Sequence, residues 1–395
     1  MLSLSKLYHF KAAAVPLALA IFLVMGSLNS CSEDPPTGGK DSCDTCNVPC
    51  DTCEVPCDTC DTTTHPCDTC NIDKDSAAHA FVWTQYSIPS EVNITGVYVS
   101  SDTEIFVIGT YLYRFNGVSW NKIDVRQQET GRPLAFPDFT MFGLGPSDLW
   151  MVQGGILDHY IDMGYDWANE FRPGSSGLGG GVIACWGTSS NDMFFVGKNG
   201  SISHFDGTTF TKMTSPTTKD LRSVWGTSHN DVWAAGFNYT TAESVLLHYN
   251  GSIWTEQNLK EIGDIRPFNH ALGEVWATDS AEHKIVIASG SLLHRKTDNG
   301  PWRSDSGYVK NYVGGGSFIG LWHTNGNNIN DFCTAGDGGF ISHWNGKTWK
   351  RYDEVYNSGD PMYITNAMSM KGNTICMVGK RNGTCWIAIG RRKPF

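Results

Sequence analysis

One pattern of hydrophobic and polar positions recurs along the chain between residues 97 and 390. Each copy has an aromatic residue, a turn, an alternating hydrophobic run ending in glycine, a second run, an Asn-Gly or Asp-Gly pair and another aromatic residue. The clearest copy is VWGTSHNDVWAAG followed by LLHYNGSIW, within residues 224–254. The spacing of 39 to 51 residues between copies is typical of propeller blades. The copies begin at Val97, Met141, Cys185, Val224, Val275, Leu321 and Ala367.

The hydrophobic runs predict short strands, because they alternate or extend for a few residues between turn residues and show no helical period. Asn-Gly at 116–117, 250–251, 299–300 and 345–346, and Asp-Gly at 206–207, supply the positive φ of tight hairpins. Three hairpins per copy give four antiparallel strands, A to D from the inside outwards. The sequence therefore predicts an all-β, seven-bladed β-propeller. Six blades is the alternative if the divergent copy at Met141 is misinterpreted.

The two ends of the repeat region predict how the ring closes. The last copy stops after KRNGTCWIAIG and so lacks its outer strand. An orphan strand, Ala80–Pro89, precedes the first copy and is similar to the outer strand of the fourth. We therefore expect the N-terminal strand to complete the last blade.

The paired motifs WGTSxNDVWxxG and LxHxNGxxW resemble a bacterial propeller repeat that is related to the photosystem II assembly-factor and Asp-box, sialidase-like propellers. The resemblance covers about residues 80–395. It implies the fold, and it implies no catalytic residue.

The N-terminal 30 residues have the features of an export signal. Lys6 and Lys11 form a basic region, and Ala12–Gly26 is an apolar run of signal-peptide length. The run leads into Leu28-Asn29-Ser30-Cys31, which resembles the lipobox of bacterial lipoproteins. We expect residues 1–30 to be a lipoprotein signal peptide and acyl chains on Cys31 to anchor the protein at the outer membrane or cell surface of a bacterium. The alternative is an ordinary secretory signal with a chance cysteine.

Residues 31–78 predict an acidic, cysteine-rich, low-complexity stalk. Eleven acidic residues and two lysines lie between residues 31 and 79, within a chain of net charge −11. Because no basic face is evident, we expect no nucleic-acid partner. The repeated C-x-x-C pairs suit disulfide staples in an oxidising compartment, with a soft-metal site as the alternative. The stalk cysteines are Cys43, Cys46, Cys50, Cys53, Cys57, Cys60, Cys67 and Cys70.

Two polar residue types recur at fixed positions of the repeat. Third-strand histidines are His159, His204, His248, His294 and His343, with Arg114 and Trp386 at the same position in two other copies. Aspartates before the second strand are Asp148, Asp192, Asp231 and Asp331. A residue present in most blades serves a need of each blade, so we expect the histidines to bond a neighbouring turn and the aspartates to make Asx turns. The alternative is a set of metal or proton sites; we predict no metal ion and no cofactor.

Repeated aromatic residues are predicted to pack between blades, with stacking on a glycan as the alternative. They are Phe142, Trp225, Trp276 and Trp322, and in the outer strand Trp120, Trp254 and Trp349. A disulfide between Cys376 and Cys385 is expected if the hairpin turns about residues 380 and 381, which would place the two cysteines opposite each other. Free, buried cysteines are the alternative.

The chain contains no G-x-S-x-G, H-E-x-x-H or P-loop motif, so no catalytic residue is assigned. The long insertions all fall on the face that carries the D–A and B–C loops: 124–138, 172–181, 260–272, 303–317, 351–364 and 237–244. Binding sites of repeat folds follow such insertions. The residues there best suited to a polar ligand are Arg126, Arg132, Arg172, Tyr239, Tyr308, Tyr356, Asp360 and Tyr363. We expect a cell-envelope binding protein for a protein or glycan ligand, with a sialidase-like glycoside hydrolase as the alternative.

Overall fold

The structure is a computed structural model that divides into two units, Met1–Cys70 and Asn71–Phe395. The residues it describes all belong to the second unit: 79–136, 139–153, 156–162, 166–171, 178, 181–238, 240–241, 243–259, 272–279, 284–289, 293–297, 303–304, 321–336, 339–355 and 364–392. Among these residues no helix has the length and apolar character needed to cross a membrane. The predicted signal peptide, Cys31 and the eight stalk cysteines lie outside the described residues.

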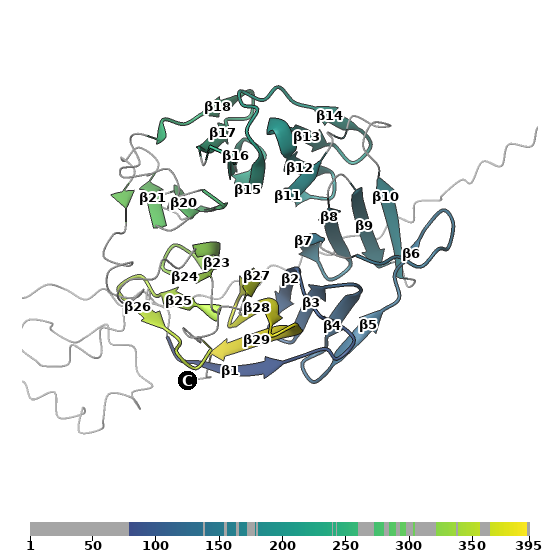
Figure 1. Ribbon diagram of the computed structural model, residues 1–395. Helices are drawn as coiled ribbons and strands as arrows, with labels where there is room; N and C mark the ends of the chain where they lie inside the picture. The colour runs from purple at the N-terminus through teal and green to yellow at the C-terminus, as the bar shows by residue number, and fades with distance from the viewer. Residues whose placement is uncertain are drawn as a thin grey trace, which may run out of the picture. The chain divides into compact units, whose positions relative to one another are not determined.

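The described strands form seven sheets arranged in a ring (Figure 1). The first three sheets are β2 (Gly96–Ser101), β3 (Glu104–Ile108), β4 (Leu112–Phe115) and β5 (Trp120–Ile123); β7 (Thr140–Gly145), β8 (Asp148–Gln153), β9 (Ile156–Asp162) and β10 (Asp166–Phe171), extended by β6 (Arg126–Gln127); and β11 (Val182–Ser189), β12 (Asp192–Gly197), β13 (Ile202–Phe205) and β14 (Phe210–Lys212). A 3-10 turn, η2 (Lys198–Gly200), joins β12 to β13.

The next three sheets are β15 (Leu221–Ser228), β16 (Asp231–Phe237), β17 (Ser244–Tyr249) and β18 (Trp254–Glu256); β19 (Glu274–Asp279), β20 (Lys284–Ser289), β21 (Leu293–Thr297) and β22 (Arg303–Ser304); and β23 (Leu321–Asn328), β24 (Asp331–Gly336), β25 (Ile341–Trp344) and β26 (Trp349–Arg351). The seventh is β27 (Ile364–Lys371), β28 (Thr374–Arg381), β29 (Thr384–Arg392) and β1 (Phe81–Tyr86). The inner strands contact one another in the order β2, β7, β11, β15, β19, β23, β27 and back to β2. The fold is therefore the all-β propeller of four-stranded antiparallel blades that the repeat predicts.

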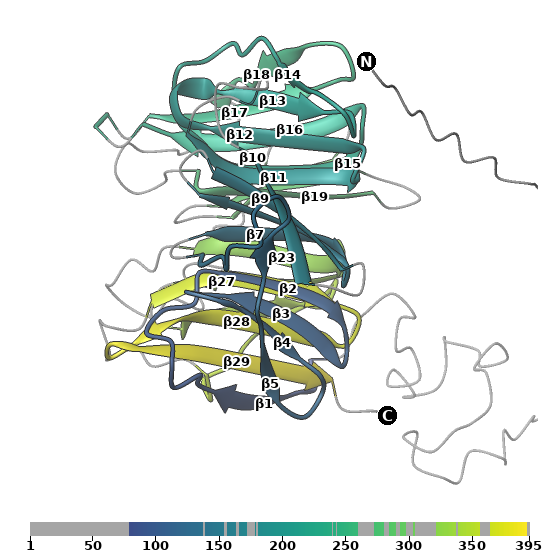
Figure 2. The same cartoon turned by 90° about the vertical axis from the view of Figure 1, so that its right-hand side faces the viewer.

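The ring closes through its N-terminal strand, as predicted. Strand β1 pairs antiparallel with β29 along its whole length, from Phe81 opposite Arg392 to Tyr86 opposite Ile387 (Figure 2). His79, just before β1, extends the closure to the neighbouring blade. Its Nδ1 lies 2.9 Å from Nδ1 of His343, and its carbonyl accepts the hydroxyl of Tyr352 at 3.0 Å. Burial, together with the nearby charges of His343, Lys350 and Arg392, lowers the pKa of His79 to about 4.

The insertion at residues 124–138 is partly a packed element and not only a loop. Strand β6 lies parallel to β10 and adds a fifth strand to the second sheet. Val125, Leu134 and Phe136, with Phe139 after them, are buried in a core shared by the first two blades. This insertion therefore strengthens the join between two blades while its polar side chains remain at the surface.

The Trp-Gly pair of the repeat has a packing role between neighbouring blades. The ring of Trp186 in β11 lies so close over Gly226 in β15 that a Cβ at Gly226 would lie 2.6 Å from it. Trp186 is 6% exposed and belongs to the core shared by these two blades. An aromatic residue of one blade and a glycine of the next thus form a single contact, which explains why the two recur together.

The Asn-Gly and Asp-Gly pairs at 116–117, 206–207, 250–251 and 345–346 form turns between the third and fourth strands. Gly117, Gly207, Gly251 and Gly346 all have φ between 88° and 94°, a conformation that glycine adopts without strain. The preceding side chain closes the turn: Asn250 Oδ1 accepts the N–H groups of residues 252 and 253, each at 3.1 Å. The sequence predicted positive φ here, and the structure shows that the glycine adopts it while the asparagine supplies the hydrogen bonds.

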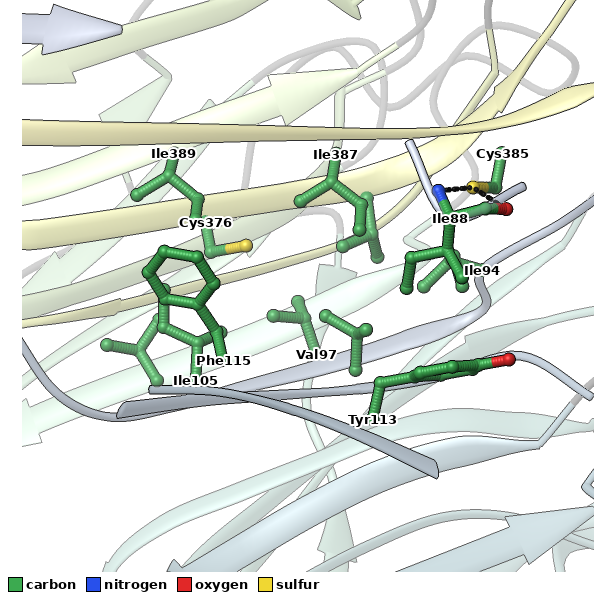
Figure 3. Close-up of a cluster of buried hydrophobic side chains, with 13 residues drawn as sticks. Ile88, Ile94, Val97, Ile105, Tyr113, Phe115, Cys376, Cys385, Ile387 and Ile389 are labelled. Carbon is green, nitrogen blue, oxygen red and sulfur yellow. Dashed lines mark hydrogen bonds between the residues drawn. The ribbon is translucent and has the colours of Figure 1, made fainter. Parts of the chain in front are cut away.

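The predicted Cys376–Cys385 disulfide is wrong in this structure. The hairpin turns at Asn382 and Gly383, both with positive φ, and not at residues 380 and 381. This register pairs Cys376 with Ile389 and Cys385 with Lys380, so the two cysteines are not opposite each other. Both are free and buried in the core between the first and last blades (Figure 3). Cys385 Sγ accepts the N–H of Ile88 at 3.0 Å, which fixes the segment that follows β1.

Candidate functional site

The inner strands enclose a central cavity of about 490 Å³. Every blade contributes to its lining, from Tyr98 in the first to Lys371 in the last. A volume of this size falls within the range of small-ligand and side-chain pockets. The cavity is therefore a natural candidate for a binding site.

One end of the cavity carries a charged and polar set of residues beside a tryptophan. Glu274 opens β19, Arg222 and Trp322 are the second residues of β15 and β23, and Asn366 is the third of β27. Each inner strand begins where the preceding D–A loop ends. This cluster therefore lies at the mouth on the face with the long insertions, and we call it the channel mouth.

Glu274 bridges two blades at the channel mouth. Its Oε2 accepts the N–H of Thr324 at 2.5 Å, and its side chain is 25% exposed. Burial raises the pKa of the Glu274 carboxyl well above its ordinary value, and the bond from Thr324 only partly opposes this. His323 Nδ1 lies 3.9 Å from the same oxygen, and burial lowers the pKa of His323 to about 4. His323 is therefore neutral at pH 7.

Trp322 is the exposed aromatic residue of the channel mouth. Its side chain is 37% exposed and packs beside Gly273 of the preceding blade. At the same mouth, the guanidinium of Arg222 lies 4.7 Å from the ring of Phe237 and 3.6 Å from Oδ2 of Asp220. A flat indole and a cation held against a ring suit a partner that carries an apolar or aromatic group beside an acceptor.

Deeper in the cavity, the lining becomes aromatic. Phe142 of β7 and Trp225 of β15 meet edge to face with ring centroids 6.1 Å apart. Tyr98 lies at the equivalent level of β2, with Nζ of Lys371 5.8 Å from its ring centre. In the described lining Glu274 is the one carboxylate. Glycoside hydrolysis uses two acids a few ångströms apart, so the described cavity does not supply that pair.

The repeated histidines and aspartates bond each other inside single blades. The Nε2-to-Oδ1 distances are 2.8 Å for His159–Asp148, 2.7 Å for His204–Asp192, 2.8 Å for His248–Asp231 and 2.8 Å for His343–Asp331. In the first blade Arg114 and Glu104 form an ion pair at the same place. The sequence expected the histidine to bond a turn, and the structure identifies the repeated aspartate as its partner. The side chain of His294 lies outside the described residues.

A threonine and an aromatic ring complete the arrangement in the best-matched blades. Thr227 Oγ1 donates to Asp231 Oδ2 at 2.5 Å, and the ring of Trp233 stacks on His248 with centroids 4.1 Å apart. The first turn, the second strand and the third strand of a blade are thereby tied together. The Thr, Asp, Trp and His of the repeat motif thus have a shared structural role.

Of the eight predicted ligand residues, Arg126 and Arg132 lie in the described part of the chain. Both are exposed, and Arg126 Nη1 donates to the carbonyl of Gly131 at 3.1 Å. They belong to the insertion around β6, and neither lines the cavity. The other six lie outside the described residues: Arg172, Tyr239, Tyr308, Tyr356, Asp360 and Tyr363.

Sequence reasoning missed the channel mouth because its residues do not repeat. The repeat predicts that Trp322, like Trp225 and Trp276, packs between blades. Trp276 is 2% exposed, in keeping with that role, whereas Trp322 stands three positions nearer the start of its strand than Trp225 does. Glu274 carried no signal beyond lying before a repeat copy. The sequence alone does not bring Trp322 and Glu274 together. Their places at the starts of β23 and β19 do so in the structure.

No family model matches the chain, and no curated protein matches its sequence. Among solved structures, "YCF48 bound to D1 peptide" matches with TM-score 0.56 and 13% identity, covering 81% of this chain and 97% of that one. YCF48 from Cyanidioschyzon merolae gives 0.53 and 15% over 77% and 98%, and the crystal structure of the WD40 β-propeller domain of Doa1 gives 0.52 and 11% over 80% and 97%. At these identities the likeness concerns the fold alone, and this chain is similar to both kinds of propeller.

Proposed function

We propose that this chain is a lipid-anchored protein of the bacterial cell envelope that binds a protein partner through the channel mouth. The propeller is a rigid scaffold, and an extended segment of the partner enters the cavity from the insertion face. The partner's apolar or aromatic side chain stacks on Trp322, and an acceptor group meets Arg222.

The observation that carries this proposal is the composition of the cavity. It joins an exposed indole, a cation and aromatic walls in about 490 Å³ while presenting a single described carboxylate. Aromatic residues and arginine are the side chains most enriched at the energetic centres of protein interfaces. This lining favours binding over the hydrolase alternative, which needs paired acids.

The fold neighbours agree with a peptide ligand. One of them is a propeller of the same fold described as bound to a D1 peptide. Propeller rings hold their blades fixed, so a central cavity is formed before a partner arrives and little ordering entropy is lost on binding.

Site-specific photo-crosslinking in cells tests the proposal. A photoreactive amino acid replaces Trp322 in the full-length protein, and a control protein carries it at Ile253, which is 60% exposed on a turn between a third and a fourth strand. We expect one envelope protein to crosslink at position 322 and not at 253. The Kd for that purified partner should then rise about tenfold or more for Trp322→Ala, the change expected on loss of a central aromatic contact.

Three results would overturn the proposal. Equal crosslinking at both positions would show contact without a specific site. Binding restricted to a glycan array, or cleavage of a fluorogenic glycoside that Glu274→Gln abolishes, would favour the glycan or hydrolase alternative.

A further inference from the structure

A second polar cluster lies between the third and fourth blades, on the face opposite the channel mouth. It is built at the turn that joins β15 to β16, where His229 reaches back to the preceding blade. His229 Nδ1 lies 2.7 Å from Asp192 Oδ1, and His204 Nε2 lies 2.7 Å from the same oxygen. Two imidazole nitrogens from two blades thus converge on one carboxylate oxygen.

The equivalent contact between the second and third blades is simpler. There Ser190 occupies the turn position of His229 and donates its hydroxyl to Asp148, whose in-blade partner is His159. Between the sixth and seventh blades the corresponding aspartate, Asp331, meets Arg392. A short donor from the next blade is therefore enough for the structural contact. The second imidazole at His229 adds a group that this contact does not require.

We propose that Asp192, His204 and His229 form a binding site for a divalent transition-metal ion, with Zn²⁺ as the best-fitting probe. The set of two imidazoles and one carboxylate is a known three-ligand combination for Zn²⁺. The three ligand atoms lie within 4.8 Å of one another. Tetrahedral bonds of about 2.0 to 2.1 Å separate neighbouring ligand atoms by roughly 3.3 Å, so each of the two nitrogen-to-oxygen distances, 2.7 Å in this structure, needs to open by about 0.6 Å.

The surroundings orient the ligands and leave the ion accessible. Thr188 Oγ1 donates to the second carboxylate oxygen, Asp192 Oδ2, at 2.5 Å, which directs Oδ1 towards the imidazoles. The side chains of Asp192 and His204 are 15% and 19% exposed, while that of His229 is 47% exposed. Asp192 and His204 are thus held within one blade. The exposed side of the site, at His229, leaves a fourth coordination position open to water or to a ligand from a partner.

Calorimetric titration with Zn²⁺ tests the site in the full-length protein. The protein is first alkylated in its native state, so that the stalk thiols do not bind the metal. We expect His229→Ser to bind one equivalent less than the wild type, because serine restores the donor found at position 190 and removes the ligand. The matched control, Ser190→Ala, alters the same turn one blade earlier and should retain the full stoichiometry.

Two further measurements separate metal binding from loss of structure. Without metal, His229→Ser should unfold at the wild-type midpoint, whereas saturating Zn²⁺ should raise the unfolding temperature of the wild type by several degrees and leave the variant unchanged. Co²⁺ should give the visible absorption bands of a tetrahedral site with nitrogen and oxygen ligands in the wild type and in Ser190→Ala, but not in His229→Ser. Equal Zn²⁺ stoichiometry in the wild type and His229→Ser, or no binding by either, would overturn the proposal and leave a hydrogen-bonded contact only.

Discussion

Strand β1 makes the closure of the ring accessible to a single substitution. Phe81 is its first residue, 6% exposed, and packs against the rings of His343 and Tyr352 at 5.3 and 5.9 Å. The guanidinium of Arg392 lies 4.9 Å from its centre. Phe81→Ala therefore removes contacts from the join between the last two blades without changing the backbone pairing of β1 with β29.

The expected cost follows from the burial of the ring. Phe→Ala in a core costs about 3 to 5 kcal/mol, from lost transfer free energy and the cavity that remains. Phe81 lies at the end of an outer strand, where neighbours relax more easily, so we expect about 3 kcal/mol. For a domain of this size, that corresponds to a fall of roughly 4 to 5 °C in the unfolding temperature.

Thermal and urea unfolding of the purified protein measure this cost. The control is Val82→Ala, which changes the next residue of the same strand, where the side chain is 48% exposed. It should shift the free energy of unfolding by about 0.5 kcal/mol or less. If Phe81→Ala and Val82→Ala unfold at the same temperature, β1 does not hold the ring closed and our interpretation of the closure is wrong.

Three other predictions concern protonation, thiol chemistry and the membrane anchor. Because the folded pKa of His79 is about 4 and the unfolded value is about 6.5, the unfolded state binds more protons between these values. Stability should therefore fall as the pH decreases from 6.5 to 4, and His79→Gln should flatten that slope; parallel pH profiles would contradict it. Cys376 and Cys385 should react with iodoacetamide once the protein is unfolded, with no reducing agent needed, and should not react in the folded protein. A peptide linked through residues 376 and 385 in non-reducing mapping would refute the register of the last hairpin. A fatty-acid analogue should label the wild type and not Cys31→Ala, and equal labelling would exclude the anchor.

Much of the fold could be predicted from the sequence because every blade repeats the same local sequence pattern. Asn-Gly turns, Gly-ended strands and the missing outer strand of the last copy each report on local structure. The strand that closes the ring could also be predicted, because the expected strand Ala80–Pro89 contains the observed β1. The prediction of the Cys376–Cys385 disulfide was wrong because the hairpin between β28 and β29 has two plausible turn centres. Residues 380–381 and 382–383 differ by two positions, and only the tertiary setting selects between them.

The candidate sites could not be predicted in the same way because they arise where the repeats differ. Trp322 has the residue type of an inter-blade aromatic, but its register takes it to the channel mouth. His229 stands in a turn where its counterpart is a serine, and its approach to Asp192 depends on the distance between two blades. A pattern within one chain segment carries no information about such contacts between blades.

The pairing of β1 with β29 also has a consequence for the order of events in folding. Residue 81 is synthesised before residue 392, so β1, the outer strand of the seventh blade, has no partner until β29 has been made. Contacts this distant in sequence form slowly. Until the two strands pair, each has an open edge, and unpaired strand edges promote aggregation. A chain interrupted before β29 would therefore leave the ring open and accessible to proteases.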